Sequence, residues 1–224
     1  MPKSQTLTLS ADDGHQLAAY RADPDGAVRG RLVVIQEIFG VNRHIRAVCD
    51  RFAAGGYTAL APALFDRRTP GTELDYDPDG MARGRAVRAE IGWDDPVRDI
   101  AAAVAALAPE GPVGAVGYCW GGSLAWLTAT RLDVACAVCY YGGQIVDFKD
   151  AAAPVPVLMH FGETDQSISM DAVAAIRAAQ PDVPVHVYPA AGHGFNCDLR
   201  ADYNQAASEL ALERSMAFFA EHLG

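Results

Sequence analysis

The chain has 224 residues and a formal net charge of −10, half of its residues are hydrophobic and 21% are charged. This is the composition of an ordinary globular protein with enough chain for one sizeable α/β core. The acidic balance argues against a nucleic-acid surface and against binding to an anionic membrane, and no apolar run reaches the roughly 18 residues of a membrane span. The opening residues MPKSQTLTLS lack the apolar core of a signal peptide. We therefore expect a single domain over residues 1–224 in the cytoplasm.

The first half of the chain predicts a hairpin followed by alternating strands and helices. Residues 6–22 alternate polar and apolar positions around a turn at Asp13-Gly14, which is typical of a hairpin. The elements that follow are a buried strand in GRLVVIQEIFG ending at Gln36-Glu37, a helix from Asn42, as its cap, to about Ala54, a buried strand in YTALAPALF (57–65), a Pro- and Gly-rich loop over 66–78, and helices at about 79–91 and 94–107.

The second half continues the alternation. Its expected elements are a strand VGAV (113–116), a helix to about Thr130, a strand ACAVCYYG (135–142), a strand and loop VPVLMHFGETD (155–165), a helix at about 170–179, a strand VPVHVYP (183–189), a loop AAGHGFN (190–196) and a final helix at about 202–222. Strands that alternate with helices after an antiparallel start predict a mostly parallel, doubly wound α/β sheet.

The stretch VGAVGYCWGGSLAW places one cysteine between a strand and a helix. The spacing Gly117-x-Cys119-x-Gly121 is that of a nucleophile elbow, with cysteine in the position that serine usually holds. Such a turn strains the backbone at its central residue, and glycines on either side let the strand and the helix approach closely. The alternative is an ordinary strand-to-helix turn with a buried structural cysteine.

The other cysteines and glycines point to packing. Five cysteines are an odd number, which argues against a disulfide framework. Cys136 and Cys139 form a C-x-x-C motif, but residues three apart on a strand face opposite sides of the sheet, so we expect no metal or redox site there. Cys49 is expected to pack within its helix. The glycines do not spell the dinucleotide fingerprint G-x-G-x-x-G.

Four side chains with catalytic chemistry follow predicted strands: Glu37, Cys119, Asp165 and His193. Function in such sheets gathers at the carboxyl ends of the strands. Cysteine, aspartate and histidine occur in the order nucleophile, acid, base, which is the order of α/β-hydrolases. A helix N-terminus and a nearby imidazolium would favour the thiolate of the cysteine. In isolation, Asp165 could instead cap the following helix, and His193 could be solvated in its glycine-rich loop.

The chain resembles the dienelactone hydrolase family, the carboxymethylenebutenolidases of the α/β-hydrolase superfamily, over nearly its whole length. The similarity lies in QEIFG after the first central strand, GYCWGG at the elbow, GETD before the acid and AGHGF before the closing helix. The resemblance implies an α/β-hydrolase fold and a triad of Cys119, Asp165 and His193. It also implies an oxyanion hole made by the backbone N–H groups of Ile38 and Trp120, and neither a metal nor an organic cofactor.

The resemblance gives Glu37 a part in the reaction. In the family this glutamate contacts the resting thiol and helps to activate it when substrate binds. Carried over, Glu37 would receive the proton of Cys119, so that the thiolate forms only with ligand present and is protected from idle oxidation. The alternative is a buried glutamate that is satisfied by an arginine or by backbone N–H groups.

In the family, arginines bind the anionic lactone. The resemblance does not fix which arginines of this chain correspond to them. The segment MARGRAVRAE offers Arg83 first and Arg85 next, unless these are ordinary solvated helix residues. A second family arginine follows the catalytic histidine, but this chain has Cys197 near that position. Arg200 could replace it from one turn further on. This departure puts dienelactone itself in doubt as the substrate.

The favoured function is a cytosolic cysteine hydrolase that opens a small, anionic lactone or ester through an acyl-enzyme. A general carboxylesterase or thioesterase, or an enzyme for a short peptide bond, could use the same triad. A non-catalytic thiol sensor is the unlike alternative, but a sensor does not need an acid to orient a base. The expected partner is a small molecule, with no nucleic acid and no membrane, and the protein is expected to be a monomer or a small homo-oligomer.

Overall fold

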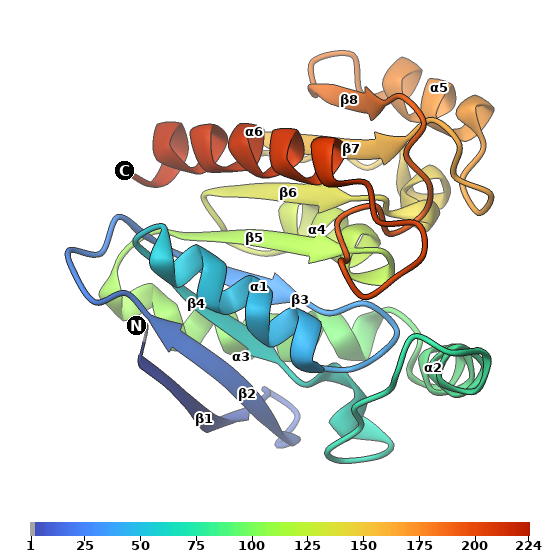
Figure 1. The fold of residues 1–224 in the computed structure, drawn as a ribbon. Coiled ribbons are helices and arrows are strands. Elements are labelled where there is room, and N and C mark those ends of the chain that lie inside the picture. Colours follow the sequence, from blue (N-terminus) through green and yellow to red (C-terminus); the bar gives the residue numbers. More distant parts are fainter. Residues whose placement is uncertain (1–2) are drawn as a thin grey trace.

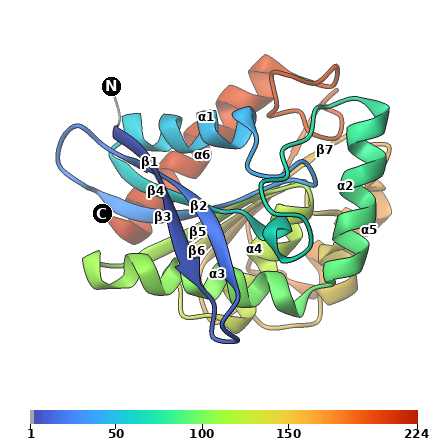
Figure 2. The ribbon, with the colours of Figure 1, turned by 90° about the horizontal axis from the view of Figure 1, so that it is seen from below.

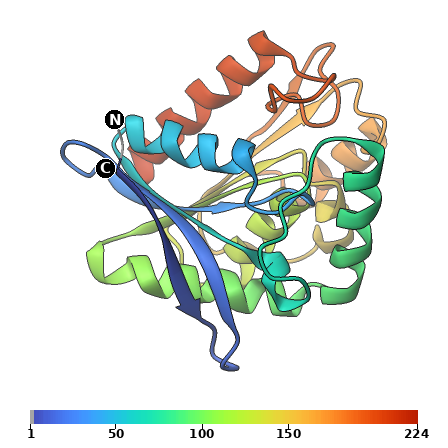
Figure 3. The same cartoon turned by 60° about the horizontal axis from the view of Figure 1, so that its bottom comes forward.

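The computed structural model describes residues 3–224, in which eight strands form one sheet. The strands are β1 (Lys3–Ser10), β2 (Gln16–Asp23), β3 (Gly30–Ile35), β4 (Tyr57–Pro62), β5 (Val113–Tyr118), β6 (Cys136–Tyr140), β7 (Val157–Gly162) and β8 (Val185–Tyr188). Their order across the sheet is β1-β2-β4-β3-β5-β6-β7-β8. β2 pairs antiparallel with β1 and with β4, and every pair from β4 to β8 is parallel. The predicted α/β-hydrolase sheet with an antiparallel hairpin at its start is confirmed, and Figure 3 shows this hairpin at the sheet edge.

Helices cover both faces of the sheet. They are α1 (Arg43–Ala54), α2 (Pro78–Ile91), α3 (Asp94–Leu107), α4 (Trp120–Arg131), α5 (Met170–Ala179) and α6 (Gln205–Leu223), with 3₁₀ helices η1 (Leu64–Arg67), η2 (Ala108–Glu110) and η3 (Gly143–Phe148). α1 and α6 lie on one face, whereas α3 and α4 lie on the other (Figure 2). α2 lies apart from both layers, beyond the carboxyl ends of the central strands (Figure 1).

The central strands are buried along their whole length because both faces are covered. Every residue of β4, β5, β6 and β7 is buried, which explains their continuous apolar sequences. α1 begins at its predicted cap, where the Asn42 side chain accepts hydrogen bonds from the backbone N–H groups of His44 and Ile45. Within residues 3–224, no helix is long and apolar enough to cross a membrane.

Two of the predicted boundaries that differ from the structure have a clear local reason. The strand expected over 57–65 ends at Pro62, and the chain turns into η1, where the Gln36 side chain accepts a hydrogen bond from the Leu64 N–H. The last helix begins at Gln205 rather than at about 202. The side chain of Asn204 caps it by accepting from the N–H of Ala207.

Candidate active site

Cys119 lies at the turn between β5 and α4 and has the backbone of a nucleophile elbow. Its φ and ψ are 57° and −118°, in a region that costs a non-glycine residue free energy. Two hydrogen bonds hold it there: its N–H donates to the Tyr140 carbonyl at 3.0 Å, and its carbonyl accepts from the Gly122 N–H at 2.9 Å. The backbone thus directs a half-buried thiol away from the strand end.

Three glycines around the cysteine make this turn sterically possible. A Cβ on Gly117 would overlap the carbonyl of Gly121, and a Cβ on Gly121 would overlap the carbonyl oxygens of Ile35 and Gln36. A Cβ on Gly122 would overlap the Tyr140 carbonyl. Close approach of backbones, rather than a left-handed conformation, therefore requires glycine at these positions.

The three residues of the predicted triad lie in hydrogen-bonding contact. The Cys119 Sγ is 3.1 Å from the His193 Nε2, and the His193 Nδ1 is 2.8 Å from the Asp165 Oδ2. The other oxygen of Asp165, Oδ1, accepts from the N–H groups of Ser167 and Ile168 at 2.7 and 3.0 Å. Asp165 thus orders its own turn and the imidazole together, while Ser169 provides the cap of α5.

When Cys119 is a thiolate, the imidazole of His193 should keep its proton up to about pH 10. Burial lowers the pKa of His193, but the charge of Cys119 and the hydrogen bond to Asp165 outweigh burial and raise it from 6.5 to about 10. Because this pKa is raised in the folded state, the resulting stability is fully present below about pH 6.5 and is lost as the pH rises through about 10. ¹⁵N NMR of the His193 ring measures the midpoint. Asp165→Asn should move it to lower pH, and an unchanged midpoint would contradict the pairing.

The two residues predicted to form an oxyanion hole both lie at the cavity beside Cys119. Ile38 and Trp120 line this cavity, and Trp120 is the first residue of α4, so its N–H lacks an intrahelical acceptor. The side chain of Gln36 holds the turn that carries Ile38. Its Nε2 donates to the Glu37 carbonyl at 3.2 Å, and its Oε1 accepts from the Leu64 N–H at 3.1 Å. Gln36 was not among the site residues predicted from the sequence, although its place as a polar residue at the end of an apolar strand was a signal for it.

Glu37 is fully buried, and its Oε2 accepts a 2.7 Å hydrogen bond from the hydroxyl of Tyr76. Burial and the Glu37 charge both raise the pKa of Tyr76, so the hydroxyl keeps the proton that it donates. Among residues 3–224, the Glu37 Oε1 has no hydrogen-bond partner. The thiol of Cys119 is paired with His193, not with Glu37 as the resemblance implied for the resting state.

The cavity beside Cys119 has a volume of about 170 Å³, which suits a small ligand, and contains several cationic side chains. Arg85 and Arg88 line it from α2, together with Met81, at the i, i+4, i+7 spacing of one helix face. Arg200 lines it from the loop before α6.

The preference for Arg83 over Arg85 needs correction. Arg83 is exposed and is not among the residues that line the cavity. Gly84 explains the rotation of α2, because a Cβ there would overlap the carbonyl of Ile38. The helix therefore packs through Gly84, so that Arg85 faces the cavity and Arg83 faces solvent.

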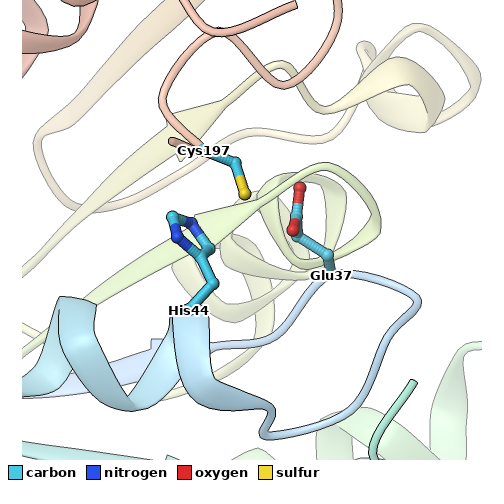
Figure 4. A group of neighbouring side chains, drawn as sticks. All are labelled: Glu37, His44 and Cys197. Atoms are coloured by element: carbon cyan, nitrogen blue, oxygen red, sulfur yellow. The ribbon is translucent and has the colours of Figure 1, made fainter. Parts of the chain in front are cut away.

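Glu37 also belongs to a second group of side chains, which could together hold a metal ion. Glu37, His44 and Cys197 are buried, and one potential ligand atom from each lies within 4.8 Å of the other two (Figure 4). The other cysteines singled out from the sequence, Cys136 and Cys139, are free and buried in β6, as expected for core packing.

Comparison with known proteins shows the family of the chain. The profile of the dienelactone hydrolase family matches residues 17–223. The carboxymethylenebutenolidase of Pseudomonas putida is 34% identical, over 97% of this chain and 96% of that protein. An Azospirillum brasilense protein assigned as a carboxymethylenebutenolidase is 37% identical, over 97% of this chain and 99% of its own length. A crystal structure of a Klebsiella pneumoniae protein, assigned as a dienelactone hydrolase, superposes with a TM-score of 0.84 at 30% identity and covers 98% of this chain and 99% of that one.

Proposed function

The chain belongs to the dienelactone hydrolase family and is a hydrolase of ester bonds, and from this we propose that Cys119, His193 and Asp165 open a small anionic lactone or ester through an acyl-enzyme. One observation carries the proposal: the hydrogen-bonded line from the Cys119 Sγ through both ring nitrogens of His193 to the Asp165 Oδ2, with the sulfur on an elbow. Such a line is the arrangement that nucleophilic catalysis requires.

The reaction follows from the order of these groups. The Cys119 thiolate attacks the carbonyl carbon, and the N–H groups of Ile38 and Trp120 stabilise the oxyanion that forms. As the C–O bond breaks, the protonated His193 gives its Nε2 proton to the leaving alkoxide. In a lactone this alkoxide stays attached to the acyl group. Water then attacks the thioester while the neutral His193 takes its proton, and the carboxylate product leaves with the thiolate restored.

Glu37 is the proposed acceptor for the proton of the resting thiol. Its Oε1 is buried and has no hydrogen-bond partner within residues 3–224, so an acceptor is available. The Tyr76 hydroxyl holds the other oxygen and fixes the orientation of the carboxylate. Glu37 would thus take the proton when substrate turns the thiol toward the carbonyl carbon, and it would return this proton to the Cys119 thiolate after the product has left. The nucleophile would then be charged only when it is needed.

The arginines of the cavity support an anionic substrate. The protein has a net charge of −10, which repels an anion at long range, so a local cation is needed to hold one. Arg85, Arg88 and Arg200 supply such cations around Cys119. A guanidinium can bind a carboxylate through two parallel hydrogen bonds, which gives orientation as well as affinity.

A substrate panel on two arginine variants tests this function. Arg85→Ala should lower kcat/KM for a carboxylate-bearing lactone roughly 10- to 150-fold, the equivalent of about 1.5–3 kcal/mol for a charge-assisted hydrogen bond. The same variant should lose almost nothing on a neutral aryl ester. Arg85 is the sharpest choice because Arg88 also lies over the Trp93 ring and Arg200 over the rings of Phe39 and Tyr76.

Arg83→Ala is the matched control, since Arg83 belongs to the same helix but lies outside the cavity. It should leave both substrates unchanged. Equal losses of Arg85→Ala on both substrates would mean that Arg85 supports the fold. No loss on either would favour the second candidate, a general carboxylesterase or thioesterase, and the panel therefore includes a neutral thioester.

A further inference from the structure

We propose that Glu37, His44 and Cys197 form a binding site for a divalent transition-metal ion of the Zn²⁺ type, and that metal bound there inhibits the hydrolase. The inhibition rests on the proposed function, because it acts through Glu37. The binding itself is independent of any activity.

The three side chains converge from different parts of the fold. Glu37 follows β3, His44 lies in the first turn of α1, and Cys197 lies in the loop before α6 (Figure 4). Their potential ligand atoms lie within 4.8 Å of one another. Zn²⁺ binds nitrogen, oxygen and sulfur at about 2.0–2.3 Å in a tetrahedron, which places the ligand atoms roughly 3.5 Å apart. The side chains need to close by only about 1 Å to reach that geometry, and a fourth position is left for a water.

Two of the three side chains contain buried polar atoms that need a partner. The Glu37 Oε1 and the His44 Nε2 have no hydrogen-bond partner among residues 3–224, although Glu37 is 0% and His44 2% exposed. Buried polar atoms are normally paired, and a cation would satisfy both of these. Neighbouring groups can orient the ligands in the way that supporting partners of metal sites do. The Tyr76 hydroxyl holds the Glu37 Oε2, and the Asp198 Oδ1 lies 3.7 Å from the His44 Nδ1.

The ionisation states also suit a metal that binds nitrogen and sulfur. Burial lowers the pKa of His44, which keeps the imidazole neutral and able to donate its lone pair. Burial, followed by the charge of Glu37, raises the pKa of Cys197 to about 12. Without metal the thiol is therefore protonated, and binding releases this proton to solvent as the metal–sulfur bond forms. The resulting thiolate and the Glu37 carboxylate balance the two charges of the ion.

The mixed set of one nitrogen, one oxygen and one sulfur ligand favours Zn²⁺ or Co²⁺ over Mg²⁺ or Ca²⁺, which prefer oxygen. Arg200 opposes the ion electrostatically. Burial lowers the pKa of its guanidinium, but the charge of Glu37 together with those of neighbouring groups outweighs burial and raises it. A metal must therefore compete with Arg200 for Glu37. Metal bound at the Oε1 removes the proposed proton acceptor of Cys119, which is why binding should inhibit the reaction.

Cobalt titration of the Cys119→Ala protein tests the binding without turnover. This background removes the other thiol–imidazole pair, Cys119 with His193, which could hold a metal itself. We expect one Co²⁺ per chain, a thiolate-to-cobalt charge-transfer band in the near ultraviolet, and loss of the band on addition of Zn²⁺. Adding Cys197→Ala should abolish the band and weaken binding by about 100-fold or more, and adding His44→Gln should weaken it at least about 10-fold.

Cys139→Ala in the same background is the matched control, because Cys139 is equally buried but lies within β6. It should keep the band. Cobalt that fails to bind the folded Cys119→Ala protein overturns the site, as does a band that survives Cys197→Ala. Circular dichroism checks that each variant is folded, and Cys197→Ala, which only shortens a side chain, decides the result if His44→Gln does not fold.

Inhibition is measured separately in the chain that retains Cys119. Zn²⁺ should inhibit ester hydrolysis, a chelator should reverse the inhibition, and Cys197→Ala should be at least about 10-fold less sensitive to Zn²⁺. Equal sensitivity of the two proteins would overturn the inhibition. If the cobalt site is present while Cys119 proves dispensable for hydrolysis, the binding stands and the proposed function fails, so the two failures are distinguishable.

Discussion

Cys119→Ala should lower kcat/KM for a small lactone or aryl ester on the order of 10⁴-fold or more. In the proposed mechanism the sulfur forms the bond to the acyl group, and the methyl group of alanine cannot replace it at the elbow, where the backbone has a φ of 57°. The residual rate would come from the oxyanion hole and from binding alone. Steady-state kinetics on the purified variant provide the measurement.

Intact-mass spectrometry adds a direct view of the intermediate. Brief exposure of the wild type to an ester that deacylates slowly should add the mass of one acyl group, and peptide mapping should place it on Cys119. Cys139→Ala is the control, because this thiol is fully buried in β6. It should keep the adduct and the activity. Wild-type turnover by Cys119→Ala would mean that the nucleophile lies elsewhere and would overturn the proposed mechanism.

Loss of His193 should cost at least about 10³-fold in kcat, and further loss of Asp165 should then cost little more. Members of a triad act as one unit, because the aspartate works only through the imidazole that it orients. His193→Asn removes the base. Asp165→Asn is the sharpest partner change, because an asparagine carbonyl can still accept from the N–H groups of Ser167 and Ile168 while its NH₂ replaces the Oδ2 beside the ring.

Single and double variants in a double-mutant cycle measure this coupling, and thermal unfolding shows whether each protein keeps its fold. Asp165→Asn alone should also be slow, since the imidazole then loses its orientation and its compensating charge. Fully additive losses would mean that Asp165 orders its turn and has no part in the chemistry.

The elbow and the positions of the triad residues could be predicted from the sequence for physical reasons that act locally. A continuous apolar run has to be a buried strand, and parallel strands bring their carboxyl ends to one edge of the sheet. Residues that follow different strands, such as Cys119, Asp165 and His193, are therefore brought together by topology alone. Helix caps gave similar information, since Asn42 marks the start of α1 as expected.

Which residues contact Glu37, and which arginines line the cavity, could not be predicted from the sequence, because both depend on tertiary packing and not on a local sequence pattern. Arg83 and Arg85 differ by two positions, which on a helix is more than half a turn, so the rotation of α2 decides which of them reaches the cavity. That rotation comes from Gly84 against the carbonyl of Ile38, a contact between segments that are far apart in the chain.

The group of Glu37, His44 and Cys197 is the feature that the sequence predicted least, because it is formed only by tertiary packing. Glu37 and His44 lie seven positions apart in the sequence. Cys197 comes much later, after strands β4 to β8, and no sequence spacing connects it to the other two. Their meeting requires the turn after β3, the start of α1 and the loop before α6 to pack against one another. The sequence by itself, through its periodicity and its strand ends, thus determined which residues lie at one edge of the sheet. Which side chains touch one another was decided only by the tertiary structure, because close packing of the core depends on all helices and strands together.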